Sequence, residues 1–388
     1  YKYPGQMTET NGELIHMKMK HSLIALAVGA ASSAAVVTPA AAGDVTVYGR
    51  AQVEIAVLSN QQEGTTCDAP NQGPSTSCDG IDILDNAQGR VGFKASEDLG
   101  NGMKGLAKFE FKADTADNDT WSARESLVGL KAGWGQVELG NLKSAYKYYG
   151  GVKYDPFVST TLQARGNGGM SGSPKYGKSS AISSIPVNTP ADPADDPNTM
   201  SSAYGHNGFL KNQLGYQYTG GPIKFRVTYG LREGSGDYSL GLMYKVDKWE
   251  IFGAAVSTGD VYNDGGNGDD LKDFMSYKLG GAFKLGAHKF MAQYEQHSAT
   301  AESGGEDFEP THMFLGWNMK MGKNVFVVQG GMYDADDPDS PNADTTYASL
   351  GVIHKFTKMT RIFGGYRMSD ADDDSKEDVI SVGLRKDF

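Results

Sequence analysis

The clearest structural signal in the chain is the stretch Ile223-Lys-Phe-Arg-Val-Thr-Tyr-Gly-Leu-Arg-Glu-Gly-Ser-Gly-Asp-Tyr-Ser-Leu-Gly-Leu-Met-Tyr-Lys-Val246. From Ile223 to Leu231 every second residue is apolar, and the residues between them are polar or small. Tyr238 to Val246 repeats the pattern. A period of two predicts β-strands with one apolar and one polar face. Each run is about nine residues long, which suits a tilted strand that crosses a bilayer.

The connections between such strands alternate between tight and long along the whole chain. The tight ones lie at 98–102, 133–135, 219–222, 247–248, 286–287, 322–323 and 357–358. The long ones lie at 59–88, 114–121, 143–207, 232–237, 258–274, 298–310, 335–344 and 370–376. A soluble β-sandwich explains the alternating strands, but it gives no reason for this order of connections. Short turns on one rim and long loops on the other predict an all-β, 16-stranded antiparallel transmembrane β-barrel.

Composition narrows the class of protein further. The net charge is −11, which argues against a nucleic-acid partner, because such proteins carry a basic stripe. No run after the N-terminal region approaches 18 consecutive apolar residues, so no membrane-spanning helix is predicted. The 51 glycines suit a chain with many turns and bends.

The N-terminal region is interpreted as a targeting segment rather than as part of the fold. Residues 1–16 show no apolar periodicity, and we interpret them as an upstream leader or a mis-assigned start. Residues 17–42 hold a basic patch, an apolar run and the small residues Ala40 to Ala42, in the order of a cleaved signal peptide. We therefore expect the barrel to occupy residues 43–388.

Two cysteines, Cys67 and Cys78, lie in one polar stretch of the first long loop. In an exported protein this pair predicts a local disulfide, and a metal site is disfavoured because no histidine lies nearby. The spacing of Asp370, Asp372 and Asp374 suggests calcium, but the glycine and bidentate glutamate of a calcium loop do not follow. We expect solvated acidic loops, with no built metal site and no cofactor, and the sequence leaves open whether divalent cations bridge these loops to lipopolysaccharide.

Four stretches carry a family resemblance: Asp44–Arg50, Arg90–Gly102, Arg124–Gly135 and Val382–Phe388. On these residues the chain resembles the general Gram-negative, proteobacterial outer-membrane porin family over its mature length. The resemblance implies a homotrimer in outer-membrane lipid and lipopolysaccharide, with periplasmic short turns. It implies a water-filled channel for passive diffusion of small hydrophilic solutes. The terminal Phe388 is similar to the family's signal for the outer-membrane assembly machinery.

The resemblance also implies where the pore is narrowed. The third long loop, 143–207, is expected to fold into the lumen and constrict it. Basic residues on the inner wall would face acidic residues of this loop and set selectivity. The family's basic cluster maps onto Arg50, Arg90 and Arg124, and Asp155 is the candidate opposing carboxylate. The inward faces of the first four strands offer Arg50, Arg90, Lys94, Lys104, Lys108 and Arg124.

Other functions stay open at this stage. A substrate-specific channel would need aromatic residues along the lumen, and the third loop offers Tyr146, Tyr148, Tyr149 and Tyr154. A binding protein, such as an adhesin or phage receptor, would use the long loops. An enzyme is not expected, because no histidine lies in a recognisable catalytic motif. Acidic outer loops favour cations and basic third-loop residues favour anions, so the sequence leaves the ion preference open.

Overall fold

The computed structural model describes residues 43–61, 80–84, 89–113, 115–116, 121–172, 208–231, 238–257, 271–301, 309–334, 344–371 and 375–388. Three sequence predictions lie outside these residues: the N-terminal leader and signal peptide (1–42), the Cys67–Cys78 disulfide, and the second part of the third loop (173–207). They stay predictions.

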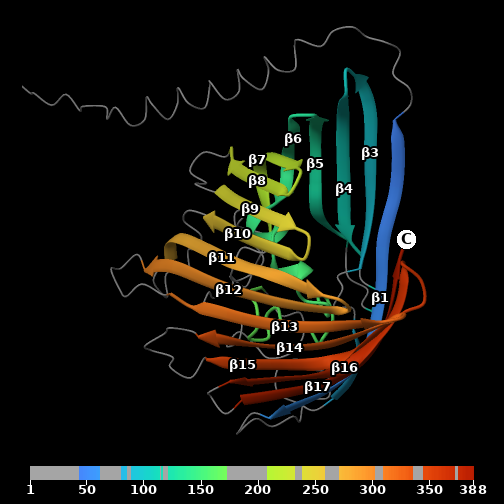
Figure 1. The fold of residues 1–388 in the computed structure, drawn as a ribbon, viewed down its shortest axis with the longest axis vertical. Helices are drawn as coiled ribbons and strands as arrows, with labels where there is room; N and C mark the ends of the chain where they lie inside the picture. Colours follow the sequence, from blue (N-terminus) through green and yellow to red (C-terminus); the bar gives the residue numbers. More distant parts are fainter. Residues whose placement is uncertain are drawn as a thin grey trace, which may run out of the picture. The chain divides into compact units, whose positions relative to one another are not determined.

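The described chain from Gly43 is almost entirely β-structure, joined into one antiparallel sheet (Figure 1). Its strands are β1 (Asp44–Gln61), β2 (Gly80–Leu84), β3 (Arg90–Gly100), β4 (Met103–Lys112), β5 (Ser122–Ala132), β6 (Gly135–Lys143), β7 (Phe209–Gly220), β8 (Ile223–Gly230), β9 (Tyr238–Val246), β10 (Trp249–Ser257), β11 (Leu271–Leu285), β12 (His288–Ala301), β13 (Thr311–Met321), β14 (Asn324–Asp334), β15 (Thr345–Lys355), β16 (Thr360–Ala371) and β17 (Ser375–Asp387).

The sheet closes on itself, because β1 pairs with the last strand β17 from Arg50 opposite Asp387 onward. On its other edge β1 pairs first with β3 and then with β2. Arg50 lies opposite Arg90 and Glu54 lies opposite Leu84, so β2 and β3 are two segments of a single wall strand. Counting them together gives the closed sixteen-stranded barrel that the sequence predicted. Closure removes free sheet edges, which a bilayer does not tolerate.

The tight connections lie where the sequence placed them. At the first of these turns, Gly100, Asn101 and Gly102 all have positive φ values of 81°, 52° and 74°. Glycine and asparagine adopt this left-handed region readily, which explains their use in the turn. The ladders extend further into the long connections than expected, since β1 reaches Gln61 and β11 begins at Leu271.

The apolar faces of the strands point outward. On β9, Leu240 and Leu242 are 48% and 51% exposed, whereas Ser239 and Met243, one position along, are buried. The same alternation runs through the neighbouring strands. A β-sandwich would bury its apolar face between two sheets. The observed orientation instead gives an apolar outer surface for lipid and a polar inner wall.

The described start of the third long connection, residues 144–172 after β6, is drawn in green among the strands in Figure 1. Its first turn is helix α2 (Ala145–Tyr148), and a short 3₁₀ helix, η1 (Gly151–Lys153), follows. The Ser144 hydroxyl accepts a 2.9 Å hydrogen bond from the Lys147 backbone N–H and caps α2. Helix α2 contacts β9 and β10, so this segment packs against the inner wall. Among the described residues, no helix is long and apolar enough to cross a membrane.

Candidate functional site

The described part of the third loop, residues 144–172, is fixed to several strands of the inner wall. Glu54 on β1 accepts hydrogen bonds from the Thr161 backbone N–H (3.1 and 3.2 Å) and hydroxyl (2.9 Å). The neighbouring Gln52 amide donates to the Ser159 carbonyl at 2.6 Å. Across the lumen, Gln293 on β12 accepts from the Gly151 N–H at 2.6 Å. Because these partners come from well-separated strands, the loop is held across the interior of the barrel.

Asp155 takes part in this anchoring. Its carboxylate accepts hydrogen bonds from the Phe157 and Ala164 backbone N–H groups, each at 2.8 Å, and from the Gln329 amide at 2.9 Å. The side chain is buried, and burial raises the pKa of Asp155 to about 6. The structure therefore places Asp155 where it braces the loop against β14, with Arg165 of the same loop as a nearby positive charge.

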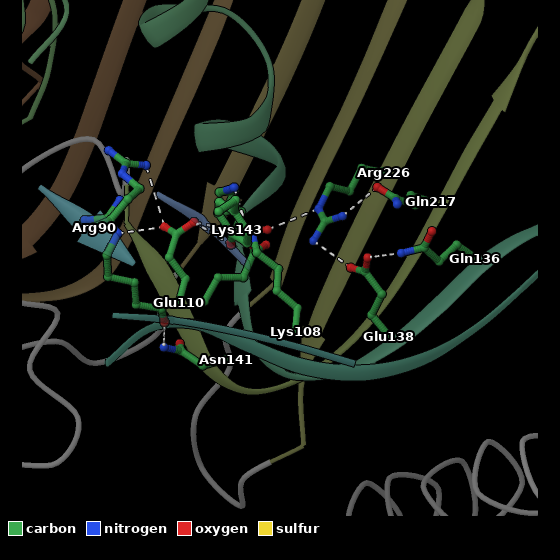
Figure 2. A network of polar contacts seen from close by, with 12 residues as sticks. Arg90, Lys108, Glu110, Gln136, Glu138, Asn141, Lys143, Gln217 and Arg226 are labelled. Atoms are coloured by element: carbon green, nitrogen blue, oxygen red, sulfur yellow. Dashed lines mark hydrogen bonds and ion pairs between the residues drawn. The ribbon is translucent and has the colours of Figure 1, made fainter. Parts of the chain in front are cut away.

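A carboxylate that the sequence analysis did not propose, Glu110 on β4, lies at the centre of that basic cluster. It accepts a 2.8 Å bond from Arg124 Nε, and Arg90 Nη1 lies 3.6 Å from the same oxygen. Lys108 Nζ lies 3.7 Å from the second oxygen, and the Tyr48 hydroxyl donates to it at 2.9 Å. Figure 2 shows Arg90 and Lys108 converging on Glu110.

The second carboxylate of the cluster, Glu125, follows Arg124 directly in β5. It pairs with Lys108, and Lys143 Nζ lies 3.0 Å from it. Successive strand residues normally point to opposite faces, yet both Arg124 and Glu125 are buried. A register shift explains this: between the pairs Phe109–Ser126 and Phe111–Ala123, β5 holds one extra residue. Such a β-bulge re-aims side chains and is common beside functional sites.

A further ion pair continues along the same wall. Arg226 on β8 donates to Glu138 on β6 at 2.9 Å and to Gln217 on β7 at 2.8 Å. Its Nε also donates to the Lys143 carbonyl at 3.1 Å, which ties the start of the third loop to β8. Figure 2 shows these contacts beside the Glu110 group. The sequence placed Arg226 on a polar strand face but did not propose it as a site residue.

The remaining predicted wall residues lie at other points on the inner face. Arg50 Nε lies 2.8 Å from Asp387 on β17, and Arg361 shares that carboxylate at 3.3 Å. Lys94 Nζ lies 4.2 Å from the centroid of the Tyr48 ring. The structure thus brings together Arg90, Lys108 and Arg124 and places Lys94 beside them through Tyr48. Arg50 is the cross-strand partner of Arg90 but pairs with Asp387, and Asp155 binds the loop backbone and Gln329.

The loop adds positive charge to the cluster. Lys147 Nζ and Arg124 Cζ lie 5.1 and 5.2 Å from the centroid of the Phe209 ring. Partial burial lowers the pKa of Lys147, and the nearby charges of Arg165 and Arg124 lower it further. We refer to Arg90, Lys108, Arg124, Lys143, Lys147 and Arg165, together with Glu110 and Glu125, as the constriction cluster, after the constriction that the sequence predicts at the third loop.

Comparison with known proteins decides the family. A model described as Gram-negative porin matches residues 22–374. The chain belongs to the Gram-negative porin family. This confirms the resemblance drawn from the sequence and places the porin in the outer membrane.

Curated relatives of this porin include the major outer membrane protein P.IB of Neisseria meningitidis serogroup B / serotype 15 (strain H44/76). It is 38% identical over 137 residues, which cover 34% of this chain and 37% of the relative. The protein of the same name from Neisseria lactamica is 36% identical over 135 residues, covering 34% of this chain and 36% of the relative. The similarity to these relatives therefore spans little more than a third of their length.

Solved structures show the same fold. The anion-selective porin from Comamonas acidovorans superposes with a TM-score of 0.67 at 16% identity, covering 89% of this chain and 100% of that chain. The trimer form of in-vitro folded OmpT, an outer membrane protein of Vibrio cholerae, gives a TM-score of 0.60 at 14% identity, with 90% and 100% covered. At these identities the similarity establishes the architecture of the barrel.

Proposed function

We propose that this porin forms a water-filled channel through which small hydrophilic solutes diffuse passively, with a preference for anions. The observation that carries the proposal is the constriction cluster, where the third loop meets the wall formed by β3 to β6. Family membership and the closed barrel with a polar interior support a channel. The charges of the cluster decide whether the channel favours anions or cations.

Six basic side chains and two carboxylates make up the constriction cluster among the described residues, and Asp155 is a third carboxylate near Arg165. Charged rings of one sign attract counter-ions into a pore and repel ions of the same sign. A cluster with this balance lowers the energy of an anion at the narrowest part and raises that of a cation. The structurally similar porin from Comamonas acidovorans is anion-selective, which agrees with this direction.

The third-loop tyrosines weigh against a substrate-specific channel. Such a channel needs aromatic faces along an open lumen. Tyr146, Tyr149 and Tyr154 are each at most 1% exposed and pack against the inner wall. Their rings stabilise the docked loop, which leaves charge and width as the basis of selection. Most residues of the outer loops lie outside the described chain, so the binding-protein alternative gains no support from a specific contact.

We extend the proposal to assembly as a homotrimer in outer-membrane lipid and lipopolysaccharide. One structural relative is described as a trimer form. Phe388, the proposed signal for the assembly machinery, pairs through its backbone with Gly49 on β1 at 2.9 and 3.1 Å. Loss of this residue would therefore weaken barrel closure as well as recognition by the assembly machinery.

Purified protein in planar bilayers and in liposomes tests the channel itself. We expect current steps in groups of three, and liposome swelling that slows as uncharged sugars become larger. Folded, heat-modifiable protein that neither conducts nor supports swelling would overturn the diffusion-channel proposal.

A further inference from the structure

A second group of basic side chains lies inside the barrel at its short-turn end, and Lys143 of the constriction cluster lies within electrostatic range of it. Four strand residues, Lys224, Lys245, Lys284 and Lys289, each lie two positions from a tight turn. Lys153 of η1 joins them from the third loop. We call these five residues the lysine cluster.

Strand register brings the members of the lysine cluster onto one face. Lys284 and Lys289 are direct cross-strand partners on β11 and β12. Lys245 on β9 lies opposite Glu250 on β10, and their Nζ and Oε2 atoms are 3.3 Å apart. Like charges directly opposite each other destabilise a strand pair, so the Lys284–Lys289 pair carries a cost that an anion would remove.

Contacts with the docked loop show that these side chains point into the lumen. The Tyr154 hydroxyl donates to Glu250 at 3.1 Å, and Lys289 Nζ lies 5.1 Å from the centroid of the Tyr154 ring. Lys153 Nζ lies 4.9 Å from the centroid of the Tyr148 ring. Tyr154 is fully buried within the barrel, so Glu250 and Lys289, which contact it, face inward.

The lysines also influence one another electrostatically. Lys153 interacts with Lys224 and Lys245, and Lys289 interacts with Lys284 and Lys245. The described group contains five ammonium groups and one carboxylate. Lys153, Lys245 and Lys284 remain exposed, so lumen water and solutes reach their ammonium groups. Flexible, exposed ammonium groups with three donors each suit a multivalent oxyanion.

We propose that the lysine cluster is a binding subsite for small multivalent oxyanions, with inorganic phosphate and phosphate monoesters as the ligand class. It lies between the constriction cluster and the short-turn mouth, and it rests on the proposed function only in assuming that solutes enter the lumen. Phosphate oxygens accept hydrogen bonds from several ammonium groups at once, and the docked loop covers one side of the subsite through Lys153 and Tyr154.

Isothermal titration calorimetry tests the subsite without requiring conduction. Inorganic phosphate is titrated into folded, detergent-solubilised protein at low ionic strength. We expect saturable binding that weakens about tenfold in the double variant K284Q/K289Q, because two charges that face the ligand are lost. The variant K284R/K289R should retain most of the binding. The matched control K323Q/K358Q removes two exposed lysines from tight turns and should leave binding unchanged.

Three results would overturn the subsite. Wild-type protein without saturable phosphate binding contradicts it, and so does an equal loss in K323Q/K358Q, which would indicate only the general field of the protein. Loss in Arg124→Gln but not in K284Q/K289Q would assign the phosphate to the constriction cluster. Phosphate binding by protein that does not conduct would contradict the channel proposal and leave the subsite standing.

Discussion

Replacing Glu54 with glutamine should loosen the third loop while leaving the barrel intact. The Glu54 carboxylate is 1% exposed and accepts bonds from the Thr161 backbone N–H, the Thr161 hydroxyl and the Ser381 hydroxyl at 2.7 Å. A glutamine has one acceptor oxygen and adds an NH₂ group that faces these donors. The change therefore removes charge-assisted bonds and leaves buried groups poorly paired.

The size of the effect follows from those contacts. A hydrogen bond to a charged group contributes roughly 1.5–3 kcal/mol, and an unsatisfied buried polar group costs a similar amount. Retention of one good bond to the glutamine oxygen leaves a loss of about 3 kcal/mol in loop docking. Since 1.4 kcal/mol corresponds to a factor of ten, the undocked population should rise on the order of 100-fold.

Hydrogen–deuterium exchange of the folded protein measures this directly. Amides of residues 155–165 should exchange much faster in Glu54→Gln than in the wild type, and amides of β11 and β12 should not change. Glu309→Gln, at an exposed carboxylate away from the loop, is the matched control. Wild-type exchange rates in the loop of Glu54→Gln would refute the assignment of Glu54 as its anchor.

Three further changes test the constriction cluster and the docking of the third loop. Arg124→Gln removes a positive charge and its 2.8 Å ion pair with Glu110. The anion-to-cation permeability ratio, measured from reversal potentials, should therefore fall about two- to threefold. An unchanged ratio would contradict the role of the constriction cluster. The pKa of Asp155 is raised from 3.8 to about 6 in the folded protein. Protonation of Asp155 therefore stabilises the docked loop fully below pH 4, and this stabilisation is lost as pH rises through 6. Exchange protection of the loop should be roughly 1 kcal/mol greater at pH 5 than at pH 7, and Asp155→Asn should abolish that difference. Gly150 has φ 68°, and an added Cβ would lie 2.2 Å from Phe252 Cζ. Gly150→Ala should therefore destabilise the docked loop by about 2 kcal/mol and speed tryptic cleavage within it. Cleavage at the wild-type rate would show that Phe252 moves aside to make room for the added methyl group.

Much of the fold could be predicted because the two faces of a barrel strand meet different solvents. The outer face must suit lipid and the inner face water, so a run such as Tyr238–Val246 shows period-two alternation. Glycine and asparagine mark tight turns, and the alternation of tight turns with long loops indicates the two rims of the barrel. The split of the second wall strand into β2 and β3 was not predicted, because it depends on the register with β1.

The constriction cluster was only partly predictable. Strand parity placed Arg90, Lys108 and Arg124 on the inner wall, and the same parity applied to Glu110 would have placed it beside Lys108. Glu125 gave no such signal, because a bulge rather than alternation turns it inward. Sequence distance does not indicate a bulge, since it arises from the pairing of two strands.

Asp155 illustrates why loop residues resist this reasoning. Its acidic charge suggested a partner for the basic wall, whereas the folded loop surrounds it with backbone N–H groups and Gln329. Which way a loop carboxylate points depends on contacts made over the whole path of the loop. Periodicity gives no information on that path.

We infer that the constriction cluster gives this porin its preference for anions. Its most direct test is the zero-current potential of the purified channel in a planar bilayer with a tenfold potassium chloride gradient. Perfect selectivity would give about 59 mV. We expect a potential of the sign set by chloride movement, smaller than that limit and reduced further in Arg124→Gln. A potential of the sign set by potassium, unaffected by Arg124→Gln, would contradict it.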